Sequence, residues 1–501
     1  MGRKPLQAGT VGHVCATMGQ ARSGTGRRSR GDPGAKQEEP AGGHREMKKI
    51  AFLCAVLLAP MAAQAQSMPG RKSYAQTGDP AHIVPSAGTT DGVAASLVQY
   101  TPAWTGAVGR PMSARLTDSL NVKDFGAACN GTVTSDDTNA FNAAMKAAAA
   151  SNKHVSIPGV TCYITSTVTI PAGVTVSGAG MGSTIIQAGS AGKFVFGAGA
   201  YAGIQDLTIT QYGTNPSCRI DAATNTPFGA SIRDVHIINP VCGIDLSGNS
   251  QMVDRARIEG VTRIGLRIGH TTTLAATVDP RVTNTTIASA RGATGMRIED
   301  AGGLYLVNND VLYGAYGTVF DPGKNQQITW VFASNTVLSD TATVDGLKID
   351  TADATAQVKG LNFEGSWSSS NGNMGVNIKN TAGGSIQNIA FSGMRFYGNR
   401  ANTIDVTGMS HFRIFNSEFC GGGPAGTDLY INTGVTHVIV ANNDFTGTCG
   451  NEASGSPAGI VFVSRNNNVV VQGNDFAGLT TAINLGSNRT IPSSSITGNL
   501  K

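Results

Sequence analysis

The sequence predicts an all-β protein built as a parallel β-helix, a solenoid of about 11–12 coils with a capping helix at its N-terminal end. A short apolar pattern recurs along the chain, a second alternating segment lies between its copies, and the spacing leaves no room for a helix. The chain has 65 glycines among 501 residues, which suits frequent tight turns. A hydrophobic content of 40% excludes a mostly disordered chain or a polytopic membrane protein.

The recurring pattern is apolar-x-apolar-x-Asn/Gly-Asn-x-apolar, as in LYLVNNDVLYG and VIVANNDFTG. Segments such as GIDL at 243 and GLRI at 265 lie between its copies. Alternation places every second side chain in a continuous core, and the Asn pairs at 308–309 and 442–443 are expected to form turn ladders. The last apolar residue of the pattern recurs about every 27 residues, at Ile209, Ile237, Ile258, Ile287, Val311, Val337, Phe363, Phe396, Phe419, Phe445 and Phe476.

The segment before the coils predicts a helix. Between Asn139 and Ser151, Phe141, Met145 and several alanines recur at helical spacing, and the preceding Ser135-Asp-Asp-Thr can supply an N-cap. We expect this helix to cover the open end of the first coil, because terminal repeats must shield the core.

The N-terminal part of the sequence predicts an export signal. Met47-Lys-Lys, the apolar run 50–59 and Ala63-Gln-Ala65 are the three parts of a signal peptide at 47–65. We interpret residues 1–46 as an over-extended gene start or a disordered basic arm, 66–118 as a linker or neck, and 119–501 as the β-helix. The predicted location is secreted or periplasmic, with no membrane association after signal cleavage.

The formal charge of +5 lies in the leader. Residues 1–65 hold ten basic and four acidic residues, which leaves 27 basic and 28 acidic residues for the rest of the chain. A nearly neutral mature chain has no electrostatic support for binding nucleic acid, so we predict no nucleic-acid partner.

Six cysteines follow the leader, an even number that predicts disulfides in an oxidising compartment. Sequence order alone does not fix their pairing, but we expect neighbours to pair because each bond would then bridge segments one coil apart. No C-x-x-C or Cys/His cluster has zinc spacing, so we predict no metal site. The expected pairs are Cys129 with Cys162, Cys218 with Cys242, and Cys420 with Cys449.

Several segments resemble the pectate-lyase superfamily, which includes polygalacturonase-like hydrolases and phage tailspike depolymerases. They are LNVKDFGA (120–127), SDDTNAFNAAMKAA (135–148) and VTIPAGVTVSGAGMGSTII (168–186), and the resemblance covers roughly residues 97–501. It implies a right-handed β-helix that acts on polysaccharides. Tailspike relatives are commonly trimers, which leaves a homotrimer open. Calcium is implied by the resemblance alone, and no cofactor is evident in the sequence.

The chain departs from the family in its catalytic motifs. The N-T-D, D-D, G-H-G and R-I-K motifs of polygalacturonase-type hydrolases are absent from residues 200–501, and no acidic calcium cluster of pectate lyases is recognisable. The fold therefore carries over from the resemblance, while the chemistry does not.

Outward side chains of stacked strands form rows, and two rows carry cations and aromatic residues. Such a surface suits an acidic polysaccharide, because guanidinium groups pair bidentately with carboxylates. The second alternating strand gives the row Asp245, Arg267, Arg297, Val319, Lys348 and Asn377. Four residues past the anchors, or five in the case of Arg263, the row reads Arg263, Arg291, Ala315, Thr341, Trp367 and Arg400, with Tyr313 and Tyr316 alongside.

These rows predict a lyase that cleaves a uronate-containing polysaccharide by β-elimination. Arg297 or Arg267 would neutralise the uronate carboxylate, and Lys348 or Tyr313 would remove the C5 proton. We expect the substrate-binding residues to be Arg267, Arg263, Arg291, Tyr316, Trp367 and Arg400.

A glycoside hydrolase is the first alternative. Glu364 lies close in sequence to Trp367, and an indole can raise the pKa of a neighbouring carboxyl group. Asp340, Asp345 or Asp350 would then supply the second carboxylate.

A non-catalytic carbohydrate-binding or structural β-helix is the second alternative. Clustering of the candidate side chains in one groove would favour the enzyme, and their dispersal over several faces would favour the structural protein. The residues that decide this are Arg267, Arg297, Lys348, Glu364 and Trp367.

Overall fold

The computed structural model describes residues 99–101, 105, 108–116, 118–212, 214, 216–269, 277–420, 423, 426–445, 457–463, 467–486 and 495–500. Residues Thr89–Lys501 form one compact unit, which is described below. The leader, the predicted signal peptide at 47–65 and the first part of the predicted linker lie outside the described residues.

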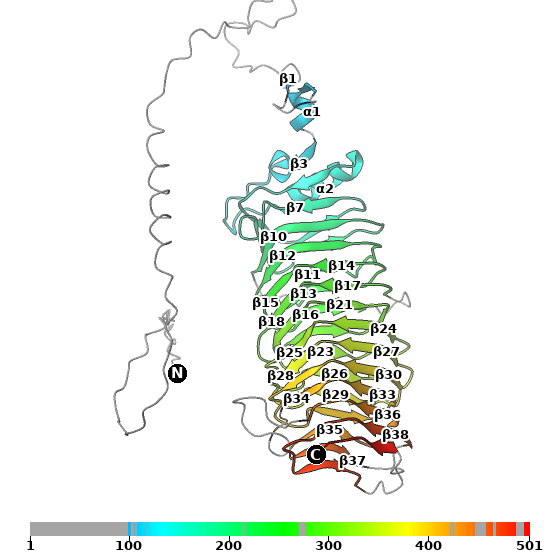
Figure 1. The fold of residues 1–501 in the computed structure, drawn as a ribbon. Coiled ribbons are helices and arrows are strands. Elements are labelled where there is room, and N and C mark those ends of the chain that lie inside the picture. The colour runs from blue at the N-terminus through cyan, green and yellow to red at the C-terminus, as the bar shows by residue number, and fades with distance from the viewer. Residues whose placement is uncertain are drawn as a thin grey trace, which may run out of the picture. The chain divides into compact units, whose positions relative to one another are not determined.

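The predicted parallel β-helix is confirmed (Figure 1). One parallel sheet has 13 strands, and each inner strand pairs with the strand one coil before it and the strand one coil after it. Its strands are β6 (Thr167–Ile170), β9 (Lys193–Phe196), β11 (Cys218–Ala222), β13 (Cys242–Leu246), β16 (Ile264–Ile268), β19 (Thr294–Ile298), β23 (Tyr316–Phe320), β26 (Leu347–Asp350), β29 (Val376–Lys379), β32 (Ile404–Thr407), β35 (Thr427–Ile431), β37 (Ala458–Phe462) and β39 (Thr481–Asn484).

The other coil strands form parallel ladders beside the 13-stranded sheet, and several long strands bend and contribute to more than one ladder. Up to Tyr313 these strands are β3 (Ser119–Asn121), β4 (His154–Ser156), β5 (Thr161–Ile164), β7 (Thr175–Ser177), β8 (Ile185–Ala188), β10 (Gly203–Gln211), β12 (Ser231–Ile238), β14 (Met252–Asp254), β15 (Arg257–Val261), β17 (Arg281–Thr283), β18 (Thr286–Ser289), β20 (Ala301–Gly302), β21 (Tyr305–Val307) and β22 (Asp310–Tyr313). The later strands are β24 (Gln327–Ser334), β25 (Val337–Asp340), β27 (Gln357–Glu364), β28 (Trp367–Ser369), β30 (Ser385–Ser392), β31 (Arg395–Tyr397), β33 (Ser410–Phe415), β34 (Glu418–Cys420), β36 (Thr436–Ala441), β38 (Asn467–Gln472) and β40 (Ile496–Thr497).

The helix predicted over 139–151 is present as α2 (Thr138–Ser151). Phe141 is fully buried, and its ring centroid lies 6.4 Å from that of Phe194 in β9. Before α2 lie the antiparallel pair β1 (Gln99–Tyr100) and β2 (Arg110–Pro111), the short helix α1 (Met112–Leu116) and the 3-10 helix η1 (Val122–Phe125). Among the described residues, no helix combines the length and apolar character needed to cross a bilayer.

Two of the three predicted disulfides are confirmed. Cys129 is bonded to Cys162, and Cys218 is bonded to Cys242. The second bond joins the first residues of β11 and β13, which are direct partners in the 13-stranded sheet. The third predicted pair includes Cys449, which lies outside the described residues.

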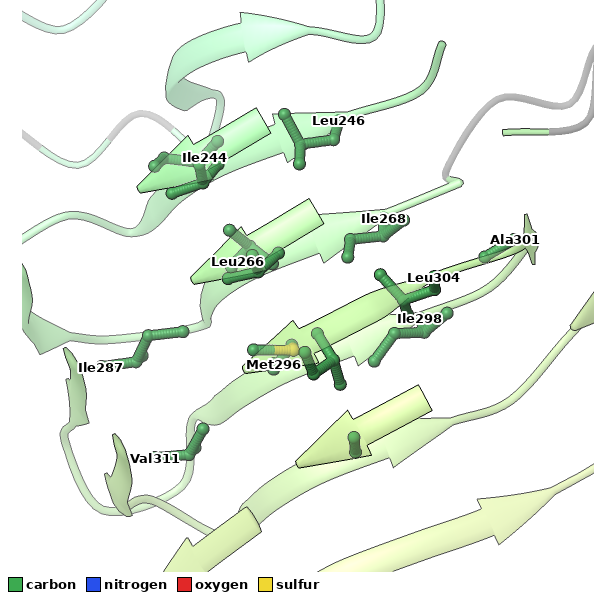
Figure 2. Packing of buried hydrophobic residues seen from close by; sticks show 14 of the residues in the cluster. Ile244, Leu246, Leu266, Ile268, Ile287, Met296, Ile298, Ala301, Leu304 and Val311 are labelled. Atoms are coloured by element: carbon green, nitrogen blue, oxygen red, sulfur yellow. The ribbon is translucent and has the colours of Figure 1, made fainter. Parts of the chain in front are cut away.

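The core consists of apolar side chains stacked coil upon coil. Phe445 lies between Phe419 and Phe476, with ring centroids 4.4 Å and 4.9 Å apart. Figure 2 shows the same layering for Ile244, Leu266 and other aliphatic residues of the middle coils. Because parallel stacking repeats the same position in each coil, an apolar side chain that recurs once per repeat makes a continuous column in the core.

The predicted Asn turn ladders are confirmed, and the two residues of each pair have different roles. Asn308 and Asn442 adopt the left-handed backbone conformation, with φ of 55° and 56°. Asn309 and Asn443 are buried, and each side chain accepts a hydrogen bond from the backbone of the preceding coil. The Oδ1 atom of Asn443 accepts from Ser417 N at 2.9 Å, so each coil satisfies backbone donors of its neighbour.

We expect Asn443→Ala to destabilise the protein by about 1–3 kcal/mol, because it leaves the buried Ser417 N–H without its acceptor. Asn362→Ala is the matched control, since Asn362 is exposed on β27. Chemical denaturation of the two variants and the wild type measures the free energy of unfolding. Equal stability of both variants would show that the buried ladder contributes nothing.

Candidate functional site

The outward side chains of the 13-stranded sheet align as the sequence predicts. Asp245 is the register partner of Arg267, and Arg267 is that of Arg297. The row continues through Val319 to Lys348, one coil at a time. Residues far apart in the sequence therefore share one face, because the strands are parallel and in register.

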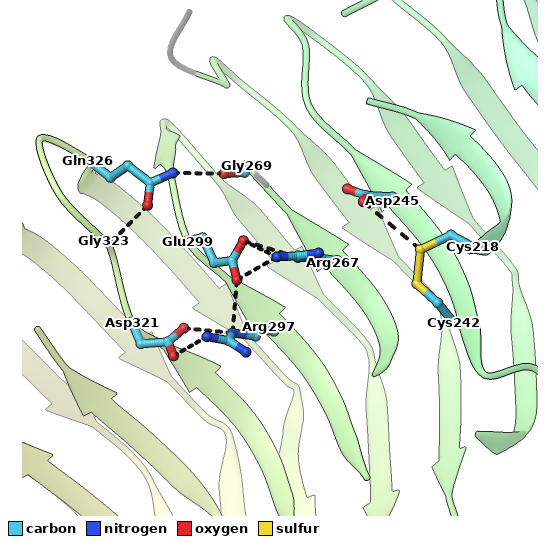
Figure 3. A network of polar contacts seen from close by, with 10 residues as sticks. All are labelled: Cys218, Cys242, Asp245, Arg267, Gly269, Arg297, Glu299, Asp321, Gly323 and Gln326. Carbon is cyan, nitrogen blue, oxygen red and sulfur yellow. Dashed lines mark hydrogen bonds and ion pairs between the residues drawn. A yellow bond between two sulfur atoms is a disulfide. The ribbon is translucent and has the colours of Figure 1, made fainter. Parts of the chain in front are cut away.

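Two carboxylates neutralise the arginines of this row (Figure 3). Arg267 donates from Nε and Nη2 to the two oxygens of Glu299, both at 3.0 Å. Arg297 donates to Asp321 at 3.0 Å and 2.8 Å, and its Nε also lies 3.0 Å from Glu299. Both guanidinium groups thus already have carboxylate partners within the protein.

Glu299 and Asp321 were not among the residues selected from the sequence. Glu299 lies two residues after Arg297 and Asp321 two residues after Val319, so each is on the same outward face as the row. That spacing is the signal that could have identified them. Burial raises the pKa of Asp321, although Arg297 opposes the shift.

Lys348 has a looser environment than the arginines. Its Nζ lies 3.4 Å from Asp350 and 5.9 Å from the centroid of the Tyr316 ring. Tyr316 begins β23 on the preceding coil, so the ammonium group lies between a carboxylate and an aromatic face.

Asp245 is the carboxyl group with the most unusual environment. It is 7% exposed, and its Oδ1 atom is buried without a hydrogen-bond partner among the described residues. Its Oδ2 lies 4.0 Å from Cys218 Sγ, but a disulfide sulfur carries no proton to donate. Burial raises the pKa of Asp245 to about 7, in spite of the nearby Arg267, so the group is largely protonated below neutral pH.

Asp221, the register partner of Asp245 in β11, has the opposite shift. Burial opposes its ionisation, but a hydrogen bond from the Thr224 hydroxyl at 2.6 Å and the ammonium of Lys193 at 3.0 Å lower its pKa. Two neighbouring carboxyl groups therefore have pKa values that move apart, which is how acid and base roles are divided in hydrolytic sites.

The other predicted cations border the 13-stranded sheet without joining the row. Arg263, Arg291 and Arg400 are exposed in the turns that precede β16, β19 and β32. Neither Arg263 nor Arg291 forms an ion pair within the part of the chain that the structure describes. Tyr313 is the last residue of β22, with φ of 63°, and is 53% exposed.

Glu364 and Trp367 lie elsewhere. Glu364 ends β27 and Trp367 begins β28, with Gly365 at φ of 56° between them. Both strands belong to ladders outside the 13-stranded sheet, so the five residues whose clustering would favour an enzyme divide between different ladders: Arg267, Arg297 and Lys348 on one, Glu364 and Trp367 on others.

Among the described residues, none of the three aspartates predicted as the second carboxylate beside Glu364 forms a hydrogen bond or ion pair with it. Asp345 accepts hydrogen bonds from Asn373 and Asn377, Asp350 pairs with Lys348, and Asp340 accepts from Ser369. In the described ranges no hydrogen bond or ion pair joins any of them to Glu364.

No arrangement of side chains in the described residues fits the calcium ion that the family resemblance implies. The single group of three potential ligands there is Cys129, Asp137 and Cys162, but its cysteines form a disulfide. The carboxylate of Asp137 instead accepts hydrogen bonds from the backbone N–H groups of Ala128 and Tyr163. On the 13-stranded sheet, the guanidinium groups already supply the positive charge beside the carboxylates.

Comparisons with known proteins agree with this fold. Residues 119–336 match the family model "Rhamnogalacturonase A/epimerase, pectate lyase-like". A search of curated proteins with the sequence found no match.

Three solved structures are similar to this chain. Tailspike protein 3 of bacteriophage CBA120 has a TM-score of 0.54 at 14% identity, covering 81% of this chain and 66% of that one. A tailspike variant of E. coli bacteriophage HK620, solved with a pentasaccharide, has a TM-score of 0.55 at 11% identity and covers 81% and 82%. The A-module of an Azotobacter vinelandii mannuronan C-5 epimerase has a TM-score of 0.48 at 18% identity and covers 76% and 99%. Residues 119–336 thus match a pectate lyase-like family model, and the two tailspike structures share the parallel β-helix fold of this chain.

Proposed function

We propose that this chain binds a polysaccharide along the outward face of the 13-stranded sheet and hydrolyses it, with Asp245 as the general acid. The observation that carries the proposal is the pair of neighbouring carboxyl groups, Asp245 and Asp221, whose surroundings favour opposite protonation states. The family model named for rhamnogalacturonase and the HK620 tailspike solved with a pentasaccharide support a polysaccharide as the ligand.

Each of the two carboxyl groups has a defined role in such a reaction. Protonated Asp245 would donate its proton to the glycosidic oxygen as the C–O bond breaks, while the Asp221 carboxylate attacks the sugar carbon and forms a glycosyl ester. Asp245, now a carboxylate, would then take a proton from a water molecule that attacks the same carbon and releases Asp221. The two residues are register partners in adjacent strands, so both side chains lie on the same face of the sheet one coil apart, and a glycosidase site needs two neighbouring carboxyl groups of this kind. Lys193 and Thr224 would keep Asp221 ionised until it attacks.

The paired arginines would serve as a fixed wall of the site. Arg267 and Arg297 are held by Glu299 and Asp321, so these four groups carry no net charge together. A neutral wall of rigid donors can hydrogen-bond sugar hydroxyls, but it gives less attraction for a uronate carboxylate than two free arginines would.

β-Elimination is the second candidate, because Arg263 and Arg291 are exposed and without ion-pair partners among the described residues. They would bind the uronate carboxylate. The neutral amine of Lys348, formed when the ammonium group loses its proton, would then remove the C5 proton. A non-catalytic carbohydrate-binding protein is the third candidate, and the division of the five deciding residues between different ladders favours it. It is the outcome that remains if neither reaction occurs.

We also propose that the protein is exported. The signal peptide predicted at 47–65 supports this, and so do the two disulfides, since such bonds persist in oxidising compartments. The homotrimer left open by the sequence remains a prediction that light scattering can check.

We expect Asp245→Asn to lower kcat on the polysaccharide substrate by at least about 100-fold, since an amide cannot donate the proton. Asp310→Asn is the control, because Asp310 is an exposed aspartate on β22. The assay measures reducing ends and the ultraviolet absorbance of unsaturated uronates, over a panel of acidic and neutral polysaccharides. Unsaturated products would establish β-elimination, and full activity of Asp245→Asn would remove Asp245 from the mechanism.

The activity of the wild type should fall as the pH rises through about 7, because Asp245 loses its proton there. The free energy of unfolding should also fall as the pH rises. The pKa of Asp245 is raised above its unfolded value of 3.8, so its contribution falls as the pH rises from about 4 to about 7. The Asp245→Asn variant cannot lose this contribution. We therefore expect its free energy of unfolding, relative to that of the wild type, to rise by up to about 4 kcal/mol between these pH values. Denaturation of both proteins from pH 4 to 8 measures it, and parallel pH profiles would contradict the assignment.

A further inference from the structure

A row of left-handed residues runs along the coils outside the 13-stranded sheet. Each position follows the same bend, and backbone hydrogen bonds connect one coil to the next along the row. The row consists of Gly173, Tyr201, Gly229, Ser250, Asp279, Gly303, Trp330, Gly360, Asn388, His411, His437 and Asn468, all with positive φ.

Tyr201 and Trp330 do not suit this backbone conformation. Their φ values are 60° and 57°, in the region where bulky side chains are rare and Gly, Asn, Asp and His are enriched. Most other positions in the row hold such tolerant residues. Both aromatic side chains are also 70% exposed, so burial of the rings does not compensate for the strain.

A glycine of the following coil lies against each ring, and only at Tyr201 would a Cβ atom on that glycine be crowded. Tyr201 lies between Gly173 and Gly229, and Trp330 lies between Gly303 and Gly360. A Cβ atom on Gly229 would be 3.1 Å from Cδ1 of Tyr201, and one on Gly360 would be 3.5 Å from Cε3 of Trp330. Each ring therefore lies against bare backbone of the following coil.

More exposed aromatic residues surround these two positions. The rings of Tyr201 and Phe228 are 5.7 Å apart and nearly perpendicular. Phe332 is two residues from Trp330 on β24, and its ring is 6.2 Å from that of Tyr305 on the preceding coil. Four of these side chains, including both members of the first pair, are at least 43% exposed.

We propose that Tyr201 and Trp330 are two stacking positions of a second polysaccharide-binding surface, which follows the row of left-handed residues. Five coils separate them, or about 24 Å at a strand spacing of about 4.8 Å, so one glycan chain would have to lie along the coils to reach both. The proposal rests on the proposed function in taking a polysaccharide as the ligand.

The residues between the two aromatic positions favour a glycan over a protein partner. Gly229, Ser250, Asp279 and Gly303 are polar or lack a side chain, so polar groups and bare backbone separate Tyr201 from Trp330 along the row. A polysaccharide matches this alternation, because a sugar ring presents an apolar face to an aromatic ring and hydroxyl groups to Ser250 and Asp279.

The test uses Trp330→Asn and Tyr201→Asn in the full mature chain. Asn already occupies this row at Asn388 and Asn468, so the fold accommodates it and the left-handed strain is relieved. We expect an unchanged or higher Tm together with an affinity about tenfold weaker for the polysaccharide. Tyr212→Asn is the matched control, since Tyr212 is exposed and outside the row. Titration calorimetry with hexagalacturonate and with maltohexaose, as acidic and neutral probes, measures the affinity.

The outcomes separate this inference from the proposed function. Normal binding by both row variants, with cleavage by the wild type, would overturn the inference alone. Absence of binding and cleavage by the wild type would overturn both. A lower Tm in Trp330→Asn would show a structural role of the indole, and a smaller assembly with unchanged affinity would show a subunit contact; either would also overturn the inference.

Discussion

The in-register parallel hydrogen bonding between coils is the constraint on which the rest of this structure depends. Each strand finds its backbone partners in the coils before and after it, so a residue is placed directly beside the residue one repeat away. The same rule stacks Phe419, Phe445 and Phe476 inside the core and aligns Asp245, Arg267 and Arg297 outside it. Core packing and site geometry are thus two consequences of one register.

The in-register stacking also places side chains of the same charge next to each other on the outward face of the 13-stranded sheet. Two arginines one coil apart would repel each other, and partly buried charges are stable only when they are paired. Glu299 meets this requirement by lying between Arg267 and Arg297, and Asp321 continues the alternation. Asp245 lies at the end of this network with one oxygen unpartnered, and the cost of burying its charge appears as a raised pKa. The unusual protonation of the site therefore follows from where the pairing ends.

At the bends of the coils, most residues also fit their surroundings without strain. Left-handed positions recur in every coil, and Asn or Gly fills most of them at little cost. Buried Asn443 satisfies the backbone of its neighbouring coil, which makes the turn part of the stacking. Where a bulky aromatic residue such as Trp330 takes a left-handed position instead, stability alone does not explain it, and ligand contact offers a physical reason.

The sequence by itself determined the period of the coils, the alignment of the outward rows and the helix before the coils, and it favoured the two disulfide pairs without fixing them. Each of these depends on spacing along the chain, and a parallel stack converts spacing directly into position. Tertiary structure alone decided that Arg267 and Arg297 are neutralised and that Glu364 lies on a different ladder from Lys348. It also decided that Asp245 is buried while Asp221 is held ionised. Ion pairing and burial depend on how far each side chain reaches and on what the neighbouring coils place beside it. The sequence of a repeat does not give these side-chain positions.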